Sequence, residues 1–167
     1  MDRDGTINVD VGYAHRVDQW QWIPGSREAI IHLKEAGFVV IVVTNQSGIA
    51  KGMYDAAQVN ALHDFANQEL DGAVDAFYFC PHDDADACGC RKPKPGMLLA
   101  AAKDLDIDLA HSWMVGDKAI DVAAGLASGA RGLRVLTGAE PGLSAGEHRG
   151  SDVFPDLAAA VDYILKR

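Results

Sequence analysis

The sequence predicts an α/β fold, in which helices cover both faces of a parallel β-sheet. Segments with helical apolar spacing alternate with short β-branched runs, an order that builds parallel sheets. The run 38–43 (FVVIVV) is continuously apolar, as in a strand buried on both faces of such a sheet. Polar motifs directly follow two predicted strands, where the sites of parallel α/β proteins lie. The 167 residues suffice for one domain, and we expect a single domain over 1–167.

The elements are placed by apolar periodicity and by residues that begin or end helices. Ala29, Ile30 and Leu33 form one apolar stripe and predict a helix at about 26–36. Pro95 is suited to open a helix and Gly129 to end one. On these grounds, further helices are expected at about 55–70, 95–105, 119–128 and 155–165. Strands are expected at about 74–79, 112–115, 133–136 and 152–154, and a polar loop at 138–150.

Composition and charge exclude several classes of protein. Acidic residues outnumber basic residues by 24 to 15, and the net charge of −9 argues against a general nucleic-acid binder. The longest strongly apolar run, 38–43, is far shorter than the ~20 residues that span a bilayer, and no signal-peptide pattern is visible. Three clustered cysteines cannot pair off internally and indicate a reducing compartment. We therefore expect a cytoplasmic protein, without a nucleic-acid or membrane partner, and we expect it to be a monomer.

Two carboxylates lie close together at the beginning of the chain, in Asp2-Arg3-Asp4-Gly5-Thr6. Their i and i+2 spacing puts both side chains on one side of an extended segment. One carboxylate can then be a nucleophile or a metal ligand while the other moves protons. Calcium loops and ordinary turns use the same pattern, so the motif carries little weight alone.

Two further motifs are suited to bind an anion. Thr44-Asn45-Gln46-Ser47-Gly48 follows the 38–43 strand and offers a hydroxyl, two amides and backbone N–H groups as a cradle for phosphate oxygens. The alternative is a polar turn that caps the next element. The segment 91–95 places three cations in four residues, and its prolines restrict where they point. A solvated basic loop is the alternative there.

A third acidic motif, 116–121, follows the predicted strand at 112–115. Asp117 and Asp121 are at i and i+4 around a strand-to-helix turn, at the carboxyl edge of the sheet. Aspartate at a helix start is often only a cap. The position at the sheet edge favours a metal ligand at Asp117.

Cysteine and histidine are grouped between the predicted strand at 74–79 and the basic segment. Cys80, His82, Cys88 and Cys90 form a Cys-x-His pair and a Cys-x-Cys pair with five residues between them. Three thiolates and one imidazole match a closed tetrahedral zinc site, which leaves no position for a substrate. The alternative is three reduced thiols and a surface histidine. We expect structural zinc that fixes the loop carrying the basic residues.

In this order, the aspartate, hydroxyl, lysine and acidic motifs resemble those of the haloacid dehalogenase-like phosphohydrolase superfamily. The resemblance implies a three-layer, Rossmann-like sheet without a separate cap domain, and a phosphatase that forms an aspartyl-phosphate. It implies Asp2 as the nucleophile and Asp4 as the general acid and base. Phosphoryl oxygens would be held by Thr44 and Lys92. Magnesium would be bound by oxygen ligands from the Asp2 side chain, the Asp4 carbonyl and Asp117, with Asp121 in support.

Finer motifs resemble one group in that superfamily, the D-glycero-D-manno-heptose 1,7-bisphosphate 7-phosphatases. They are NVDVGY at 8–13, TNQSGIAKG at 44–52 and CRKPKPGM at 90–97. The resemblance implies a phosphorylated sugar substrate from the synthesis of the lipopolysaccharide core. Its binding residues would be Asp10, Val11, Gly12, Tyr13, Asn45, Gln46, Ser47, Arg91 and Lys118. Arg91 is chemically suited to a second phosphate, because guanidinium binds phosphate through two hydrogen bonds.

Other functions stay open at this point. The histidinol-phosphate phosphatases have similar motifs, but Ser47 stands where that group carries an acidic residue. A mutase that retains the phosphoryl group would normally need a cap, and no segment is long enough to form one. A non-catalytic zinc-containing module would not need the aspartates. The histidines His32, His63, His111 and His148 are expected to have surface or packing roles, whereas His15 is near enough to the first motif to approach a substrate.

The start of the chain departs from the superfamily pattern. There the nucleophile ends the first, central strand, but here only Met1 precedes Asp2, so the first strand is expected to be missing. Our hypothesis is that Met1 is an internal methionine of a protein that begins about 5–6 residues or more upstream. The alternative is a degraded, poorly active relative.

Overall fold

The computed structural model describes residues 1–138 and 152–167, which form a parallel sheet in two hydrogen-bonded parts. One part pairs β1 (Ile41–Asn45) with β2 (Ala76–Cys80). The other part holds β3 (Trp113–Gly116), β4 (Arg131–Val135) and β5 (Asp152–Phe154) in that order. Both parts are parallel throughout. The predicted α/β class is therefore confirmed.

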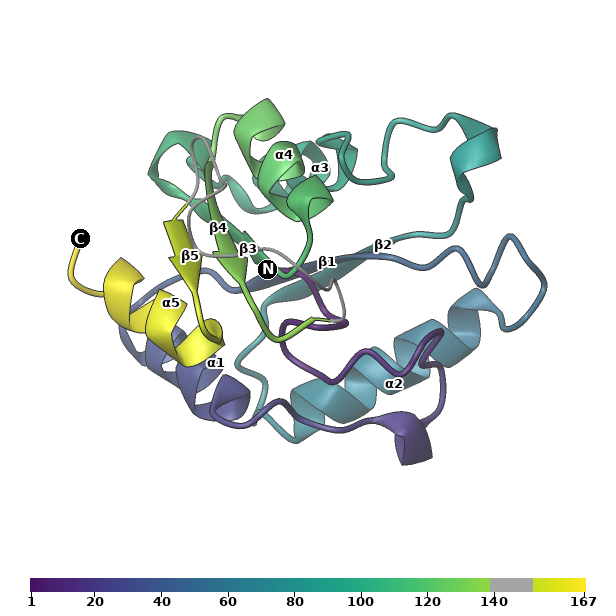
Figure 1. Ribbon diagram of the computed structural model, residues 1–167, viewed down its shortest axis with the longest axis horizontal. Helices are drawn as coiled ribbons and strands as arrows, with labels where there is room; N and C mark the ends of the chain where they lie inside the picture. Colours follow the sequence, from purple (N-terminus) through teal and green to yellow (C-terminus); the bar gives the residue numbers. More distant parts are fainter. Residues whose placement is uncertain (139–151) are drawn as a thin grey trace.

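The first two residues of the chain join the two parts of the sheet. The Met1 ammonium donates to the Ile41 carbonyl over 2.7 Å, and the Met1 carbonyl accepts from the Val43 N–H over 2.9 Å. On the other side, the Asp2 N–H donates to the Val115 carbonyl over 2.8 Å. The N-terminus accordingly lies in the middle of the fold, between β1 and β3 (Figure 1).

The expected position of the first strand holds only these two residues. Burial, and next the charge of Lys92, lowers the pKa of the Met1 α-amino group to about 5. A largely apolar cavity of about 350 Å³ lies beside Met1 and is lined by 38–41 and by β3 residues. Asp2 therefore takes the place that the end of a central strand would take.

Helices cover both faces of the sheet, which gives three layers (Figure 1). One face packs against α1 (Ser26–Glu35), α2 (Ala56–Gln68) and α5 (Leu157–Ile164). The opposite face packs against α3 (Gly96–Leu105) and α4 (Ala119–Ser128). Short 3₁₀ helices lie at Val17–Gln19, Asp84–Asp86 and Leu109–His111.

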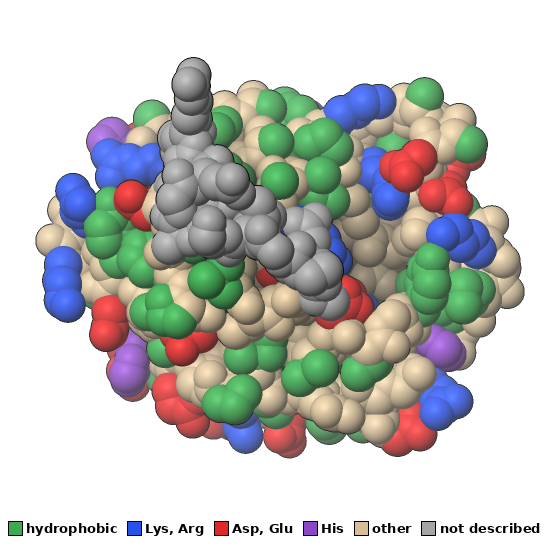
Figure 2. Space-filling view, in the orientation of Figure 1, with side chains coloured by type: hydrophobic (Ala, Val, Ile, Leu, Met, Phe, Trp, Pro, Cys, Tyr) green, Lys and Arg blue, Asp and Glu red, His purple; other side chains and the backbone are tan. Residues whose placement is uncertain are grey.

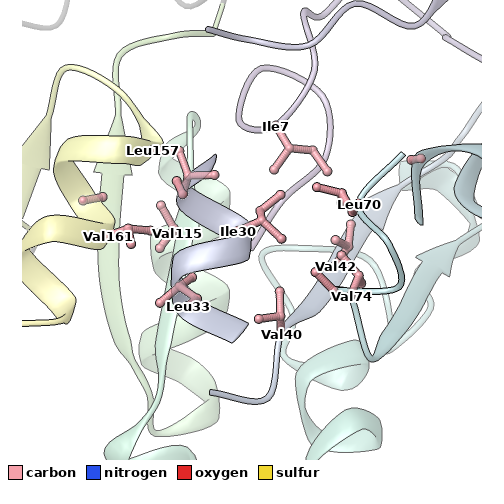
Figure 3. Close-up of a cluster of buried hydrophobic side chains, with 14 of the residues drawn as sticks. Ile7, Ile30, Leu33, Val40, Val42, Leu70, Val74, Val115, Leu157 and Val161 are labelled. Carbon is pink, nitrogen blue, oxygen red and sulfur yellow. The ribbon is translucent and has the colours of Figure 1, made fainter. Parts of the chain in front are cut away.

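The larger hydrophobic core lies between the sheet and the α1, α2 and α5 layer. Figure 3 shows Ile30 and Leu33 of α1 beside Val42 of β1 and Val115 of β3. Successive strand residues point to opposite faces, so Val43 belongs to a second, smaller core on the α3 side. Each fully buried Val, Leu or Ile side chain stabilises the fold by about 1.5–3 kcal/mol.

The predicted helices are confirmed to within two residues at every end, but β1 is displaced from its predicted range. The ladder with β2 begins at Ile41, opposite Ala76, rather than at Phe38. Phe38 instead donates its N–H to Leu33 at the end of α1, and Val39 is 51% exposed. The prediction that the whole run is buried was therefore wrong at Val39. The run extends beyond the length of strand that β2 can pair.

Some expectations lie outside the described residues, among them most of the polar loop at 138–150, with His148. Within the described ranges, no helix is both long enough and apolar enough to cross a bilayer. On the face shown in Figure 2, acidic and basic side chains are interspersed rather than separated into single-sign patches.

Candidate active site

The four predicted motifs meet at the carboxyl edge of the sheet, around one cavity of about 240 Å³. Asp2 comes from the centre of the sheet, Thr44 from the end of β1, and Asp117 directly follows β3. Lys92 is carried in from the segment between β2 and α3. The cavity is lined by Asp2, Asp4, Asp10, Gly12, Tyr13, Thr44, Asn45, Gln46, Ser47, Tyr54, Lys92, Lys118 and Ile120.

A buried lysine is at the centre of this arrangement. The Lys92 Nζ atom lies 2.7 Å from Asp2 Oδ1 and 2.6 Å from Asp121 Oδ1, and it donates to the Val43 carbonyl over 3.0 Å. Burial works to lower the pKa of Lys92, but the charges of Asp2 and Asp121 outweigh it and raise the pKa. The lysine is therefore a fixed cation beside Asp2. Asn45 holds its backbone, because the Asn45 side chain donates to the Lys92 carbonyl and accepts from its N–H.

Three buried carboxylates share the space around this one cation. Asp2, Asp117 and Asp121 each offer an oxygen within 4.8 Å of the others. Burial, followed by the charge of Asp121, raises the pKa of Asp2 to about 6. Burial, followed by the charge of Asp2, raises the pKa of Asp117 to about 7. The group carries more negative charge than one lysine can balance.

The donor set fits a divalent cation such as Mg²⁺. Neither oxygen of Asp117 has a hydrogen-bond partner among the described residues, and the nearest cation, Lys118 Nζ, lies 3.9 Å from Oδ2. A buried carboxylate without partners is strongly unfavourable unless an ion neutralises it. Carboxylate and carbonyl oxygens are the ligands that Mg²⁺ prefers. Asp2 and Asp117 therefore have the chemistry and the position of magnesium ligands.

Glycine is required where the first motif passes Asp117. Gly5 has φ +80°, and a Cβ atom there would lie 2.5 Å from Asp117 Oδ2. Any larger residue would strain the backbone and displace the carboxylate. The glycine of the Asp-x-Asp-Gly motif thus lets the first motif approach the acidic group.

Asp4 is held by four hydrogen-bond donors. Arg3 donates from Nε to Oδ1 over 3.1 Å and from Nη2 to Oδ2 over 2.9 Å. Asn8 adds a bond to Oδ1 over 3.0 Å, and Gln46 adds one to Oδ2 over 3.1 Å. Asp4 also lines the cavity. These four hydrogen bonds therefore hold the Asp4 carboxylate in a fixed orientation at the cavity.

Hydrogen bonds link the polar residues that follow β1. Gln46 donates from Nε2 to Thr44 Oγ1 over 2.9 Å, and its Oε1 accepts from the Tyr54 hydroxyl over 2.7 Å. Tyr54 lines the cavity, and its ring stacks on His15 with 4.8 Å between the centroids. Sequence reasoning missed Tyr54, because it lies in a turn outside every motif. His15 approaches the site through this ring and is absent from the cavity lining.

The expected substrate-binding residues are mostly brought to the cavity. Asp10 pairs with Lys118 over 3.1 Å, although the two are 108 residues apart, and Tyr13 accepts a hydrogen bond from Lys51 over 2.7 Å. Val11 and Arg91 do not line the cavity. The Val11 side chain is exposed, and Arg91 donates to Asp84 and to the His82 carbonyl instead.

The cysteine and histidine group closes into one cluster. Its sulfur atoms lie 3.1 Å (Cys80 to Cys90), 3.6 Å (Cys80 to Cys88) and 3.5 Å (Cys88 to Cys90) apart. His82 Nδ1 lies 3.6 Å from Cys80 Sγ and 3.3 Å from Cys90 Sγ. Zinc–sulfur bonds of about 2.3 Å require sulfur separations of this order around a tetrahedral ion. The chemistry and spacing of the four ligands fit zinc.

The parallel sheet and the buried acidic centre with its lysine define the class of haloacid dehalogenase-like hydrolases. A family model described as HAD-hydrolase-like matches residues 89–160. D-glycero-beta-D-manno-heptose-1,7-bisphosphate 7-phosphatase of Yersinia pestis is 44% identical over 175 residues, covering 99% of this chain and 87% of that protein. The same enzyme of Escherichia coli K12 is 41% identical, covering 99% and 86%. The chain therefore belongs to the family of heptose 1,7-bisphosphate 7-phosphatases within this class.

Solved structures agree with this family. The crystal structure of D,D-heptose 1,7-bisphosphate phosphatase from B. bronchiseptica, complexed with magnesium and phosphate, has a TM-score of 0.88 and 39% identity. The match covers 99% of this chain and 96% of the chain in that crystal structure. The corresponding Burkholderia thailandensis enzyme has a TM-score of 0.68 and 33% identity over 99% of this chain and 96% of its own. The three-layer fold expected from the sequence is confirmed.

Proposed function

We propose that this chain is a Mg²⁺-dependent phosphatase that removes the 7-phosphate of D-glycero-D-manno-heptose 1,7-bisphosphate. The observation that carries the proposal is the contact of Lys92 Nζ with Asp2 Oδ1, next to the unpartnered oxygens of Asp117. That arrangement suits a nucleophile, a phosphate-binding cation and a metal ligand that lie next to one another. The relatives named as heptose bisphosphate phosphatases support the choice of substrate.

The reaction uses the two carboxylates of the first motif in turn. The Asp2 carboxylate attacks phosphorus, the P–O bond to the sugar breaks, and Asp4 gives its proton to the departing sugar oxygen. Asp4 then takes a proton from the water that attacks the phosphoaspartate, which frees Asp2 and inorganic phosphate. Thr44 and Lys92 hold the phosphoryl oxygens during both transfers.

Magnesium would be held by the Asp2 side chain, the Asp4 carbonyl and Asp117. When bound, it neutralises charge between an anionic nucleophile and an anionic phosphate. Asp121 contributes by pairing with Lys92 rather than by facing the substrate. In this proposal the lysine is kept charged and in place by a carboxylate that takes no part in the chemistry.

The remaining polar groups of the cavity bind the sugar and its other phosphate. Lys118 and Asp10 form an ion pair in the cavity lining and offer a cation and a hydroxyl acceptor. Ser47 and Gln46 add polar contacts from the loop after β1. We assign Arg91 to the second phosphate. To bind it, Arg91 would leave its present partner, the exposed Asp84. Val11, Gly12 and Tyr13 belong to the loop that borders the sugar.

The zinc site has a structural role in this proposal. Zinc on Cys80, His82, Cys88 and Cys90 would occupy all four positions of a tetrahedron and leave none for substrate. The cluster lies directly before Arg91 and Lys92 in the chain, so it fixes the start of the segment that delivers the lysine. We further propose that the protein acts as a cytoplasmic, single-domain monomer. For a monomer, light scattering should give a mass of about 17.8 kDa.

A phosphate-release assay tests the proposed function. Heptose 1,7-bisphosphate, histidinol phosphate and a simple hexose phosphate are compared, each with Mg²⁺ and with chelator. We expect the highest kcat/KM for the heptose bisphosphate, and activity only with the metal. Asp2→Asn, which is nearly isosteric, should abolish turnover without unfolding the protein. Preference for histidinol phosphate, or full activity with chelator, would contradict the proposal.

A further inference from the structure

A completely buried arginine separates the two catalytic aspartates. The Arg3 side chain is 0% exposed, and each of its guanidinium nitrogens has a partner. Nε and Nη2 form a fork on the Asp4 carboxylate, and Nη2 also donates to the Ala14 carbonyl over 2.8 Å. Nη1 lies 3.3 Å from Nε2 of His63, a residue of α2 that is 60 positions away. The arginine therefore connects Asp4 to the helix behind the site.

His63 lies in the core at a position where an apolar residue would fit. It is 2% exposed, and its ring stacks on Phe77 of β2 with 4.6 Å between centroids. Burial, and next the charge of Arg3, lowers the pKa of His63 to about 3, so the imidazole is neutral. A neutral ring bonded to an arginine accepts at Nε2 and carries its proton on Nδ1.

The second nitrogen of this histidine is unsatisfied. Nδ1 has no hydrogen-bond partner among the described residues. A buried donor without a partner costs about 1–3 kcal/mol, a loss that leucine or phenylalanine at this position would avoid. In the described part of the chain, the contact with Arg3 is the polar interaction that His63 makes. The imidazole therefore bonds to the arginine at the cost of an unsatisfied donor in the core.

We propose that Arg3 and His63 are positioning residues for the proton transfers at Asp4, acting through the chain His63–Arg3–Asp4. This inference rests on the proposed phosphatase function. His63 fixes the free end of the guanidinium, and the guanidinium fork fixes the plane of the Asp4 carboxylate at two points. Without that support, Asp4 still lines the cavity but in a less defined orientation. Displacements of about 1 Å at a reacting group can lower a rate about 100-fold.

The choice of leaving group separates positioning of Asp4 from general damage. An alkyl phosphate, such as a sugar phosphate, needs a proton on its departing oxygen, whereas p-nitrophenyl phosphate releases a stable phenolate. His63→Leu should therefore lower kcat/KM for the sugar phosphate about tenfold and change kcat/KM for p-nitrophenyl phosphate less than about twofold, a selective loss typical of impaired general acid catalysis. Arg3→Lys, which retains the charge but not the fork, should show the same selectivity with a larger loss.

Two control variants complete the experiment. His63→Gln keeps an acceptor oxygen for Arg3 and should restore most of the sugar-phosphate activity. Val59→Ala removes two methyl groups, and no polar group, from a fully buried position one turn before His63 on the same helix, and should affect both substrates equally. Equal losses on both substrates in His63→Leu, without rescue by His63→Gln, would overturn the inference. A wild-type protein inactive on both substrates with Mg²⁺ would instead overturn the proposed function, and the inference with it.

Discussion

Asp117 contributes to the proposed chemistry through a side chain that destabilises the metal-free fold. Both of its oxygens are buried, and neither has a hydrogen-bond partner within the described residues. Its pKa is raised from 3.8 to about 7, by burial first and then by the charge of Asp2. The folded protein thus holds this proton more tightly than the unfolded chain does. Stability is lost as the pH rises from about 4 to about 7, and Mg²⁺ would restore it.

Asp117→Asn should therefore stabilise the metal-free protein at pH 8. Asparagine cannot ionise, and removal of the buried charge should raise the free energy of unfolding by about 1–3 kcal/mol. At pH 4, where the wild-type carboxyl is protonated, the two proteins should differ little. Urea unfolding in chelator at both pH values measures this. A variant that is less stable than wild type at pH 8 would contradict the assigned electrostatics.

Lys92 stabilises the metal-free fold, whereas Asp117 destabilises it. Lys92→Met should lower the free energy of unfolding by about 3–5 kcal/mol, because it leaves Asp2 and Asp121 buried without their cation. The same variant should lose phosphatase activity. The double variant Lys92→Met with Asp121→Asn should recover part of the stability and none of the activity. If the double variant were no more stable than the single one, the pairing of Lys92 with Asp121 would not matter to the fold.

The segment between β2 and α3 delivers Lys92 to the sheet edge. The cysteine and histidine cluster fixes its beginning, and α3 fixes its end from Gly96 onward. Between them, the side chain of Asn45 at the end of β1 holds the Lys92 backbone in place. Lys92 is therefore positioned jointly by the cluster, by α3 and by Asn45.

Loss of one zinc ligand should weaken this delivery. Wild-type protein should contain about one zinc per chain by elemental analysis, and Cys88→Ser should contain little. Activity of Cys88→Ser should fall about 10–100-fold, since Lys92 would no longer be held within the required tolerance. Asp2→Asn is the matched control, inactive but with a full zinc content. Wild-type protein with free thiols and no zinc would refute the zinc assignment.

The two parts of the sheet meet through Met1 and Asp2. Their backbone groups bond to β1 on one side and to β3 on the other. The larger core also continues across this junction, from α2 to α5. Asp2, the proposed nucleophile, therefore lies where the two parts of the sheet meet.

This connection predicts one cooperative unfolding transition for the 167-residue chain. Trp20 and Trp22 pack in or against the larger core, and Trp113 begins β3, so tryptophan fluorescence reports on the larger core and on the β3–β5 part of the sheet. Fluorescence and far-UV circular dichroism should give coincident urea curves. Two separated transitions would show that the parts fold independently and would contradict the single-domain prediction.

The sequence was sufficient to predict the architecture and the meeting of the four motifs. The architecture follows from local apolar patterns. The motifs meet because each follows a strand or lies near one, and the carboxyl ends of parallel strands lie at one edge of the sheet. The contact of His63 with Arg3 was not predictable, since the two residues are 60 positions apart and a histidine among apolar helix residues indicates packing. The start of β1 depends on the length of its partner, β2, which apolar content does not report.

Direct detection of phosphorylated Asp2 is the most direct test of the central claim that this residue is the nucleophile. Protein is mixed with heptose 1,7-bisphosphate and Mg²⁺, quenched in acid within one turnover, and digested for mass spectrometry. Wild-type protein should carry a phosphoryl group on the peptide that holds Asp2, and Asp2→Asn should not. Wild-type protein that releases phosphate at full rate without ever carrying this modification would contradict it.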